Sequence, residues 1–205
     1  MTLPAILTRV KAAGFTVFER GNFNLNLCAV RTESRVADKF DDWFYCAYRD
    51  GGMWQVHKWE CTTDPGLYHL KNPSRVAGTA VLVGNRQYRG AWRLAKHRNQ
   101  YEALCQRTGR AVSVWRDPTR DEIINLGGDD APEIQEQTGI FGINIHRSSL
   151  RNAPGDGRDP FVGRYSAGCV VFRNAEPDFA TLINLCHRQI RAGHGETFSL
   201  TLLED

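Results

Sequence analysis

Two residues of this 205-residue chain have the types and the placement that cysteine-dependent attack on a carbonyl requires. His146 ends an alternating stretch, and Cys169 follows a Ser-Ala-Gly tripeptide and precedes an apolar run. A cysteine attacks as its thiolate, and a nearby imidazole both removes the thiol proton and stabilises the charge. We therefore predict that Cys169 is a nucleophile and that His146 is its general base, which later protonates the leaving amine.

Two short strands must position these residues. Residues 141–146 alternate apolar and polar side chains, the period-2 pattern of a half-buried strand, so Asn144 and His146 are expected on the face away from the apolar residues. Gly168 suits a tight turn before Cys169, because glycine tolerates backbone angles that other residues avoid. The apolar residues 170–172 predict a second strand. The pattern therefore predicts a thiol at the start of one strand and an imidazole at the end of another.

The turn before the second strand supplies the other groups of the predicted catalytic centre. The backbone N–H groups of Gly168 and Cys169 are expected to bind the oxyanion that forms during attack, since a turn can aim adjacent amides at one point. Ser166 has two interpretations. It orients His146 through its hydroxyl or carbonyl, or it only stabilises the turn.

Three further polar residues are candidate substrate contacts. Asn144 either fixes the ring of His146 or satisfies a turn. Arg147 suits a bidentate contact with a substrate carboxylate, although the pleat points it away from His146 unless the strand ends there. His97 is either a solvated loop residue or a substrate contact beside the site. No His-x-x-x-His or Cys-x-x-Cys pair occurs, so no metal site is predicted.

The order His146…Ser166-x-Gly168-Cys169 resembles the active-site signature of the L,D-transpeptidase catalytic domain family, cysteine enzymes of bacterial cell-wall peptide chemistry. The fuller strings GINIHR and SAGC are similar to a branch of that family met in phage proteins thought to degrade the host wall. Phrases that fit the same branch extend the resemblance over nearly the whole chain; they lie at residues 23–31, 62–66, 78–83 and 96–106.

The chain departs from the family pattern at three positions near the predicted site. Ala167 stands where the family usually has a second histidine, and Val171 stands where it has arginine or asparagine. Arg147 replaces the usual glycine after the strand histidine. These departures concern the acceptor side and the grip on substrate more than the cysteine–histidine pair.

The resemblance implies a function in peptidoglycan chemistry without a cofactor. The expected substrates are peptidoglycan stem peptides, whose amide bonds would be broken through a thioester on Cys169. Attack of water on that thioester gives a phage endolysin-like peptidase, which we favour, whereas attack of an amine gives a cross-linking L,D-transpeptidase. A non-catalytic wall-binding module and a cysteine–histidine protease or amidase of another fold are the alternatives.

The composition of the chain argues against nucleic acid and membrane insertion. Hydrophobic and charged residues make up 41% and 24% of the chain, as in ordinary globular proteins. A net charge of +3 is too small to indicate nucleic acid, and no apolar run approaches the roughly 20 residues that span a bilayer. Arg9 and Lys11 interrupt the apolar N-terminal pattern, so no secretory signal is predicted. We expect a monomer made in the cytoplasm with its six cysteines reduced, acting on the wall after release.

The remaining pattern predicts many short strands and two or three helices, without the alternation of βαβ folds. We therefore expect one mainly β (α+β) domain over residues 1–205, for which the resemblance implies an L,D-transpeptidase-like β-sandwich or barrel. A strand with one wet face is expected at 23–27, and a glycine-linked hairpin at 43–49 and 53–61. Further strands are predicted at 76–83, 86–92, 111–115 and 197–203, and helices at 4–14, 101–107 and 177–193.

Overall fold

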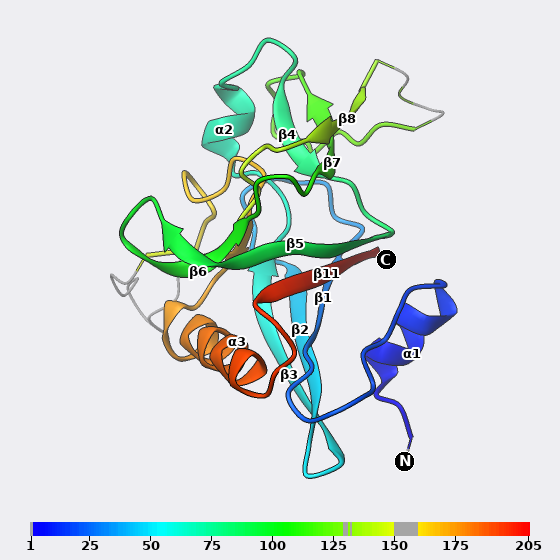
Figure 1. Ribbon diagram of the computed structural model, residues 1–205. Coiled ribbons are helices and arrows are strands. Elements are labelled where there is room, and N and C mark those ends of the chain that lie inside the picture. The colour runs from blue at the N-terminus through cyan, green and yellow to red at the C-terminus, as the bar shows by residue number, and fades with distance from the viewer. Residues whose placement is uncertain (1, 129–130, 132, 150–159) are drawn as a thin grey trace.

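The computed structural model describes residues 2–128, 131, 133–149 and 160–205 (Figure 1). The strands are β1 (Asn26–Arg31), β2 (Asp42–Asp50), β3 (Met53–Thr62), β4 (Thr79–Leu82), β5 (Arg86–His97), β6 (Tyr101–Gln106), β7 (Val112–Asp117), β8 (Glu136–Gly139), β9 (Ile145–Arg147), β10 (Val170–Phe172) and β11 (Thr197–Glu204). The helices are α1 (Ala5–Ala12), α2 (Leu67–Lys71), the π-helical turn η1 (Ala175–Phe179) and α3 (Ala180–Arg191).

Eight strands close into a barrel in the order β1-β11-β5-β6-β9-β10-β3-β2, and β4, β7 and β8 form a second sheet. The prediction of a mainly β protein with few helices is confirmed. Inward-facing side chains of the barrel share one apolar core with Leu82 of β4 and Val114 of β7. The small sheet therefore extends the packing of the barrel at the upper end seen in Figure 1.

The predicted hairpin is present as β2 and β3, paired without a break from Asp42↔Cys61 to Asp50↔Met53. Its two-residue turn consists of Gly51 and Gly52, which both have positive φ. Such backbone angles match the twist of the two strands and favour glycine, so the turn sequence fixes the register. Of the other strands, the one expected at 76–83 begins only at Thr79.

β1 corrects the prediction of a strand at 23–27 with one wet face. It begins at Asn26, and all six of its residues are buried, because both faces are covered. Leu27 and Ala29 face the barrel core, whereas Cys28 and Val30 pack against α1. The side chain of Asn26 forms hydrogen bonds with the backbone of Phe18 and Ala47 instead of water.

The helix predicted at 101–107 is wrong, since this segment is the strand β6. Its Ala, Leu and Glu residues favour helix, but pairing with β5 from Arg93↔Cys105 to His97↔Tyr101 overrides that preference. Arg98 and Asn99 both have positive φ and make the tight turn between the two strands. This turn brings His97 next to the strands that hold the predicted site.

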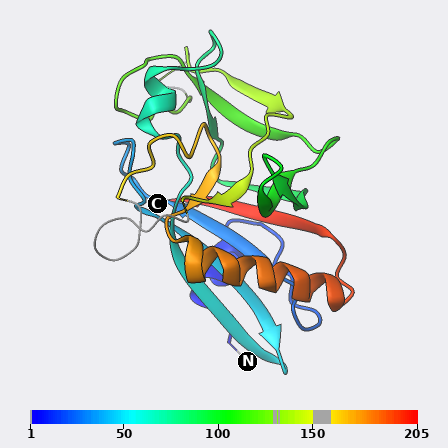
Figure 2. The ribbon, with the colours of Figure 1, turned by 90° about the vertical axis from the view of Figure 1, so that its left-hand side faces the viewer.

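The long helix α3 begins at Ala180, three residues after the predicted start, because η1 precedes it. Its apolar face, with Leu182, Leu185 and Cys186, belongs to the barrel core. Figure 2 shows α3 lying lengthwise against the strands. Within the described residues, no helix is both long and apolar enough to cross a bilayer.

Candidate active site

The turn from Ser166 to Cys169 is held by its own serine. The Ser166 hydroxyl donates to the Cys169 carbonyl at 2.8 Å and accepts the Gly168 N–H at 3.1 Å. The Ser166 carbonyl accepts a hydrogen bond from Gly66 N–H at 2.9 Å. Of the two interpretations of Ser166, these contacts favour the one in which it stabilises the turn.

Gly168 meets two constraints that exclude other residues. Its φ is +115°, and a Cβ added there would lie 2.4 Å from the carbonyl oxygen of Ala80. Its N–H is already bonded to the Ser166 hydroxyl. Among the described residues the Cys169 N–H has no hydrogen-bond partner, so it is the predicted oxyanion donor that remains open.

The sulfur of Cys169 lies between two backbone groups of the segment before β9. It accepts the Asn144 N–H at 3.4 Å and donates to the Gly142 carbonyl at 3.7 Å. Burial raises the pKa of the thiol to about 11, against the opposing effect of the Asn144 N–H. The resting group at neutral pH is therefore a thiol, although the residue is partly exposed.

His146 is buried in β9, with 3% of its surface exposed, so it does not lie on a wet face. Its Nδ1 lies 2.8 Å from the Arg147 carbonyl, which can only accept, so Nδ1 carries the proton and Nε2 offers a lone pair. Burial, His97 and two nearby arginines lower the pKa of His146 to about 3, with the Arg147 carbonyl opposing. The ring is therefore a neutral base.

His97 lies beside this ring, which corrects the interpretation of His97 as a solvated loop residue. It ends β5 and is 8% exposed. Its ring stacks on that of His146, with centroids 4.3 Å apart, and its Nδ1 lies 3.2 Å from Asn144 Nδ2. Burial and two arginines lower its pKa. His97 contacts both Asn144 and His146, so these two side chains lie together, although Asn144 precedes β9 and the face is not the wet one predicted.

Arg147 and His146 line one cavity, because β9 ends at Arg147. Its guanidinium carbon lies 3.9 Å from the centre of the Tyr101 ring, and the Tyr101 hydroxyl is 3.4 Å from Nδ1 of His146. The cavity, here called the His146 cavity, has a volume of about 340 Å³. Its lining includes His97, Arg98, Tyr101, His146, Arg147, Ser148, Arg164 and Tyr165.

The parallel pairing of β9 with β10 relates the thiol to the imidazole. Val170 pairs with Ile145 and Val171 with His146, so Cys169 lies level with Asn144. Cys169 and His146 are thus diagonal neighbours on one sheet face. The structure brings the two side chains to one face, and no hydrogen bond among the described residues joins them.

Gln106 holds the segment before β9 in place through hydrogen bonds, and it was not among the site residues predicted from the sequence. Its Oε1 accepts three consecutive backbone N–H groups, from Phe141 (3.1 Å), Gly142 (2.9 Å) and Ile143 (3.1 Å). Its own N–H donates to Asn144 Oδ1 at 2.9 Å. Since these partners lie more than 30 residues along the chain, no local pattern indicated the role.

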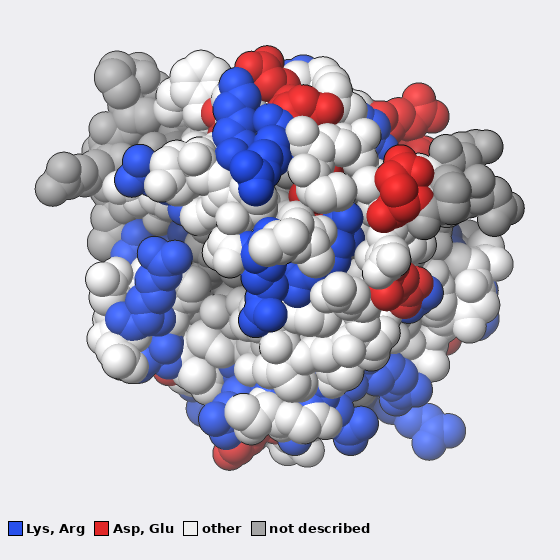
Figure 3. All heavy atoms as spheres, turned by 90° about the horizontal axis from the view of Figure 1, so that it is seen from above, with Lys and Arg blue, Asp and Glu red and all other residues white. Residues whose placement is uncertain are grey.

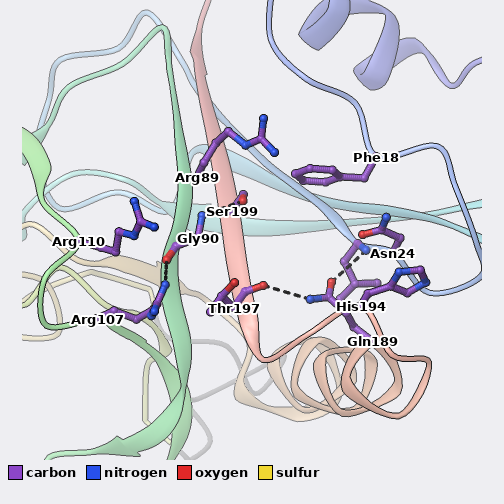
Figure 4. Close-up of a pocket in the computed structure, with 11 residues that line it drawn as sticks. Phe18, Asn24, Arg89, Gly90, Arg107, Arg110, Gln189, His194, Thr197 and Ser199 are labelled. Carbon is purple, nitrogen blue, oxygen red and sulfur yellow. Dashed lines mark hydrogen bonds between the residues drawn. The ribbon is translucent and has the colours of Figure 1, made fainter.

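A separate basic cavity of about 340 Å³ contains neither Cys169 nor His146 (Figure 4). Arg107 donates to the Gly90 carbonyl there, at a bulge where β5 pairs irregularly with β11. Arg89, Arg107 and Arg110 line this cavity, together with His194 of the turn after α3. Within the described part of the chain, no three His, Cys, Asp or Glu residues are grouped so that they could hold a metal ion.

Comparison of the chain with protein-family models, curated proteins and solved structures found no match to any of them.

Proposed function

We propose that this protein is a cysteine-dependent peptidoglycan peptidase, related to the L,D-transpeptidases and akin to phage endolysins. Its barrel would then be a variant of the L,D-transpeptidase fold. The observation that supports the proposal best is the pairing of β9 with β10, which sets a neutral imidazole and a thiol on one sheet face, with the imidazole lining the His146 cavity. The sequence motif and this geometry point to the same two residues, Cys169 and His146.

The reaction begins with transfer of the Cys169 proton to Nε2 of His146, which requires the thiol to rotate away from the Gly142 carbonyl. Because both groups are neutral at rest, the transfer is coupled to attack on the peptide carbonyl rather than preceding it. The oxyanion of the tetrahedral intermediate accepts the Cys169 N–H. His146 then donates the proton to the leaving amine, and a thioester remains on the sulfur.

Water completes the cycle by attacking the thioester, with His146 removing its proton and returning a proton to the departing sulfur. Arg147 and the two neighbouring arginines of the His146 cavity, Arg98 and Arg164, suit the carboxylates of stem peptides. Asn144 contacts two residues of the predicted site. Its backbone N–H donates to the Cys169 sulfur, and its side-chain Nδ2 lies within hydrogen-bond distance of His97 Nδ1.

The test is digestion of purified sacculi and defined muropeptides, with products identified by mass. We expect the wild type to break stem-peptide or cross-link amide bonds and Cys169→Ala to lose at least a thousandfold in rate. Cys105→Ala is the matched control, because Cys105 is the other partly exposed cysteine. New cross-links in place of cleavage would assign the protein to transpeptidation. Activity that survives Cys169→Ala would contradict the proposal.

A further inference from the structure

A small pocket, separate from the His146 cavity, borders the turn that carries Cys169. It has a volume of about 170 Å³, and Ala167 of the turn forms part of its wall. Phe141, also in its wall, precedes Gly142, whose carbonyl accepts the Cys169 thiol. This pocket, here called the Arg116 pocket, is therefore adjacent to the predicted nucleophile.

Arg116 of β7 lines the pocket and is a buried cation, with 7% of its surface exposed. Its polar contacts are with neutral groups: Nε donates to Gln137 Oε1 at 2.9 Å and Nη1 to the Gly78 carbonyl at 3.4 Å. Its guanidinium carbon lies 4.8 Å from the centre of the Phe141 ring. None of the ion pairs among the described residues includes Arg116.

A second guanidinium, that of Arg75, adds charge repulsion to the cost of burying Arg116. Arg75 lines the same pocket, and burial together with the charge of Arg75 lowers the pKa of Arg116. Taking a charge out of water is costly unless an opposite charge meets it. Figure 3 looks down on the end of the molecule that carries α2, β4, β7 and β8, and Lys and Arg side chains gather in the middle of this face. An anion in the pocket would relieve the repulsion.

The size and the walls of the pocket narrow the class of anion. Ala80, Phe141, Ile140 and Ala167 contribute apolar surface to its wall, beside the two arginines. Its volume is well below the roughly 300 Å³ at which pockets begin to hold drug-sized ligands. There is room for one small residue but not for a chain that continues through it, and a guanidinium fork matches a carboxylate bidentately. These features fit the carboxylate end of a peptide.

We propose that the Arg116 pocket binds the C-terminal carboxylate of the peptide substrate, with Arg116 as the bidentate partner and Arg75 as the second cation. The terminal residue then lies beside the bond that Cys169 attacks, so the protein selects stem peptides with a free end. This inference rests on the proposed function for its substrate. The small side chain of Ala167 leaves the pocket open at the position where the L,D-transpeptidase family usually has a histidine.

The test measures binding rather than turnover, with the full chain carrying Cys169→Ala. A synthetic stem tetrapeptide with a free C-terminal carboxylate and the same peptide as its C-terminal amide are titrated by calorimetry. We expect the free acid to bind at least tenfold more tightly than the amide. Adding Arg116→Gln removes that preference, whereas Arg120→Gln, an exposed arginine outside the pocket, preserves it.

A second variant tests the pocket without replacing Arg116, so the test does not depend on the folding of Arg116→Gln. Ala167→Leu narrows the pocket at its exposed wall and leaves Arg116 itself unchanged, and we expect it to remove the preference as well. Equal affinity for the two peptides, binding of neither, or a preference that survives both variants overturns the inference. If the preference is present but the wild type cleaves no muropeptide, the subsite stands and the proposed peptidase activity fails.

Discussion

Two buried arginines show how differently the same side chain is used in this protein. Arg31 of β1 is fully buried, yet Glu204 lies 2.8 Å from its Nη1 and Asp64 lies 2.9 Å from its Nε. Its Nε donates to the Thr63 hydroxyl, and its Nη2 donates to the carbonyls of Thr63 and Leu82. Although burial opposes the charge, these carboxylates and nearby Asp42 raise its pKa.

Arg116 is nearly as buried but contacts only neutral groups, and its pKa is lowered. The difference separates two roles. A guanidinium whose charge is met within the described chain, as in Arg31, ties strands together. A guanidinium that lines a pocket beside the predicted nucleophile without such a partner, as in Arg116, suits the external anion that we propose.

The largest effect is expected at Arg31. Arg31→Met leaves Asp64 and Glu204 without their buried counterion, so we expect a loss of about 3–5 kcal/mol in the free energy of unfolding. Chemical denaturation measures it. Arg9→Met provides the control, because the Arg9–Asp205 pair is exposed and should be worth under about 1 kcal/mol. Equal losses for the two variants would show that burial of the Arg31 network does not set its contribution.

At Arg116 the same kind of change should spare the fold and damage function. Arg116→Gln removes an unmatched buried charge, so we expect the free energy of unfolding to change by less than about 1 kcal/mol. Cleavage of stem peptides with a free C-terminus should fall at least tenfold, mainly through KM. A loss of stability as large as that of Arg31→Met would make Arg116 a structural residue and remove the contrast.

The pH dependence of stability tests the Arg31 network through Asp64, one of the two carboxylates paired with Arg31. Desolvation raises the pKa of Asp64 to about 7 despite the nearby Arg31, compared with about 4 in an unfolded chain. Between these values the folded state binds more protons than the unfolded state, so this group's contribution to stability falls as pH rises. Asp64→Asn should therefore gain stability relative to the wild type from pH 4 to pH 7. Denaturation at several pH values checks this; a constant difference would contradict it.

The smallest effect is expected when Arg116 is made to resemble Arg31. Gln137→Glu places a carboxylate where the amide oxygen now lies 2.9 Å from Arg116 Nε. We expect a gain of up to about 1 kcal/mol in stability and weaker binding of the free-acid peptide. Thermal denaturation and calorimetry measure the two effects. Unchanged peptide affinity would indicate that the charge of Arg116 is not available to ligands.

The parts of the fold that local signals dictate could be predicted from the sequence. Gly51 and Gly52 indicated the hairpin, alternating residues indicated β11, and an apolar run indicated β10. The strand predicted at 141–146 forms only as β9, Ile145–Arg147. Segment 101–107 was misread because its helix-favouring residues are overruled by pairing with β5. With β6 misplaced, the contact of His97 with His146 was not expected.

The Arg116 pocket could not be predicted, because it depends on distant segments. Arg116 lies in β7, Arg75 precedes β4, Phe141 precedes β9 and Ala167 precedes β10. In the sequence, Arg116 only marks the end of a strand. The absence of a carboxylate partner among the described residues appears only when the small sheet is packed against the barrel.

The central claim is that Cys169 carries the acyl group during the reaction, and intact-protein mass spectrometry tests it most directly. The wild type is mixed with a stem tetrapeptide and quenched in acid within the first turnover. We predict an added mass equal to the acyl part of the peptide, mapped to the fragment that contains Cys169 and strongly reduced in His146→Gln. Peptide cleavage without that adduct, at an undiminished rate in Cys169→Ala, would contradict the account.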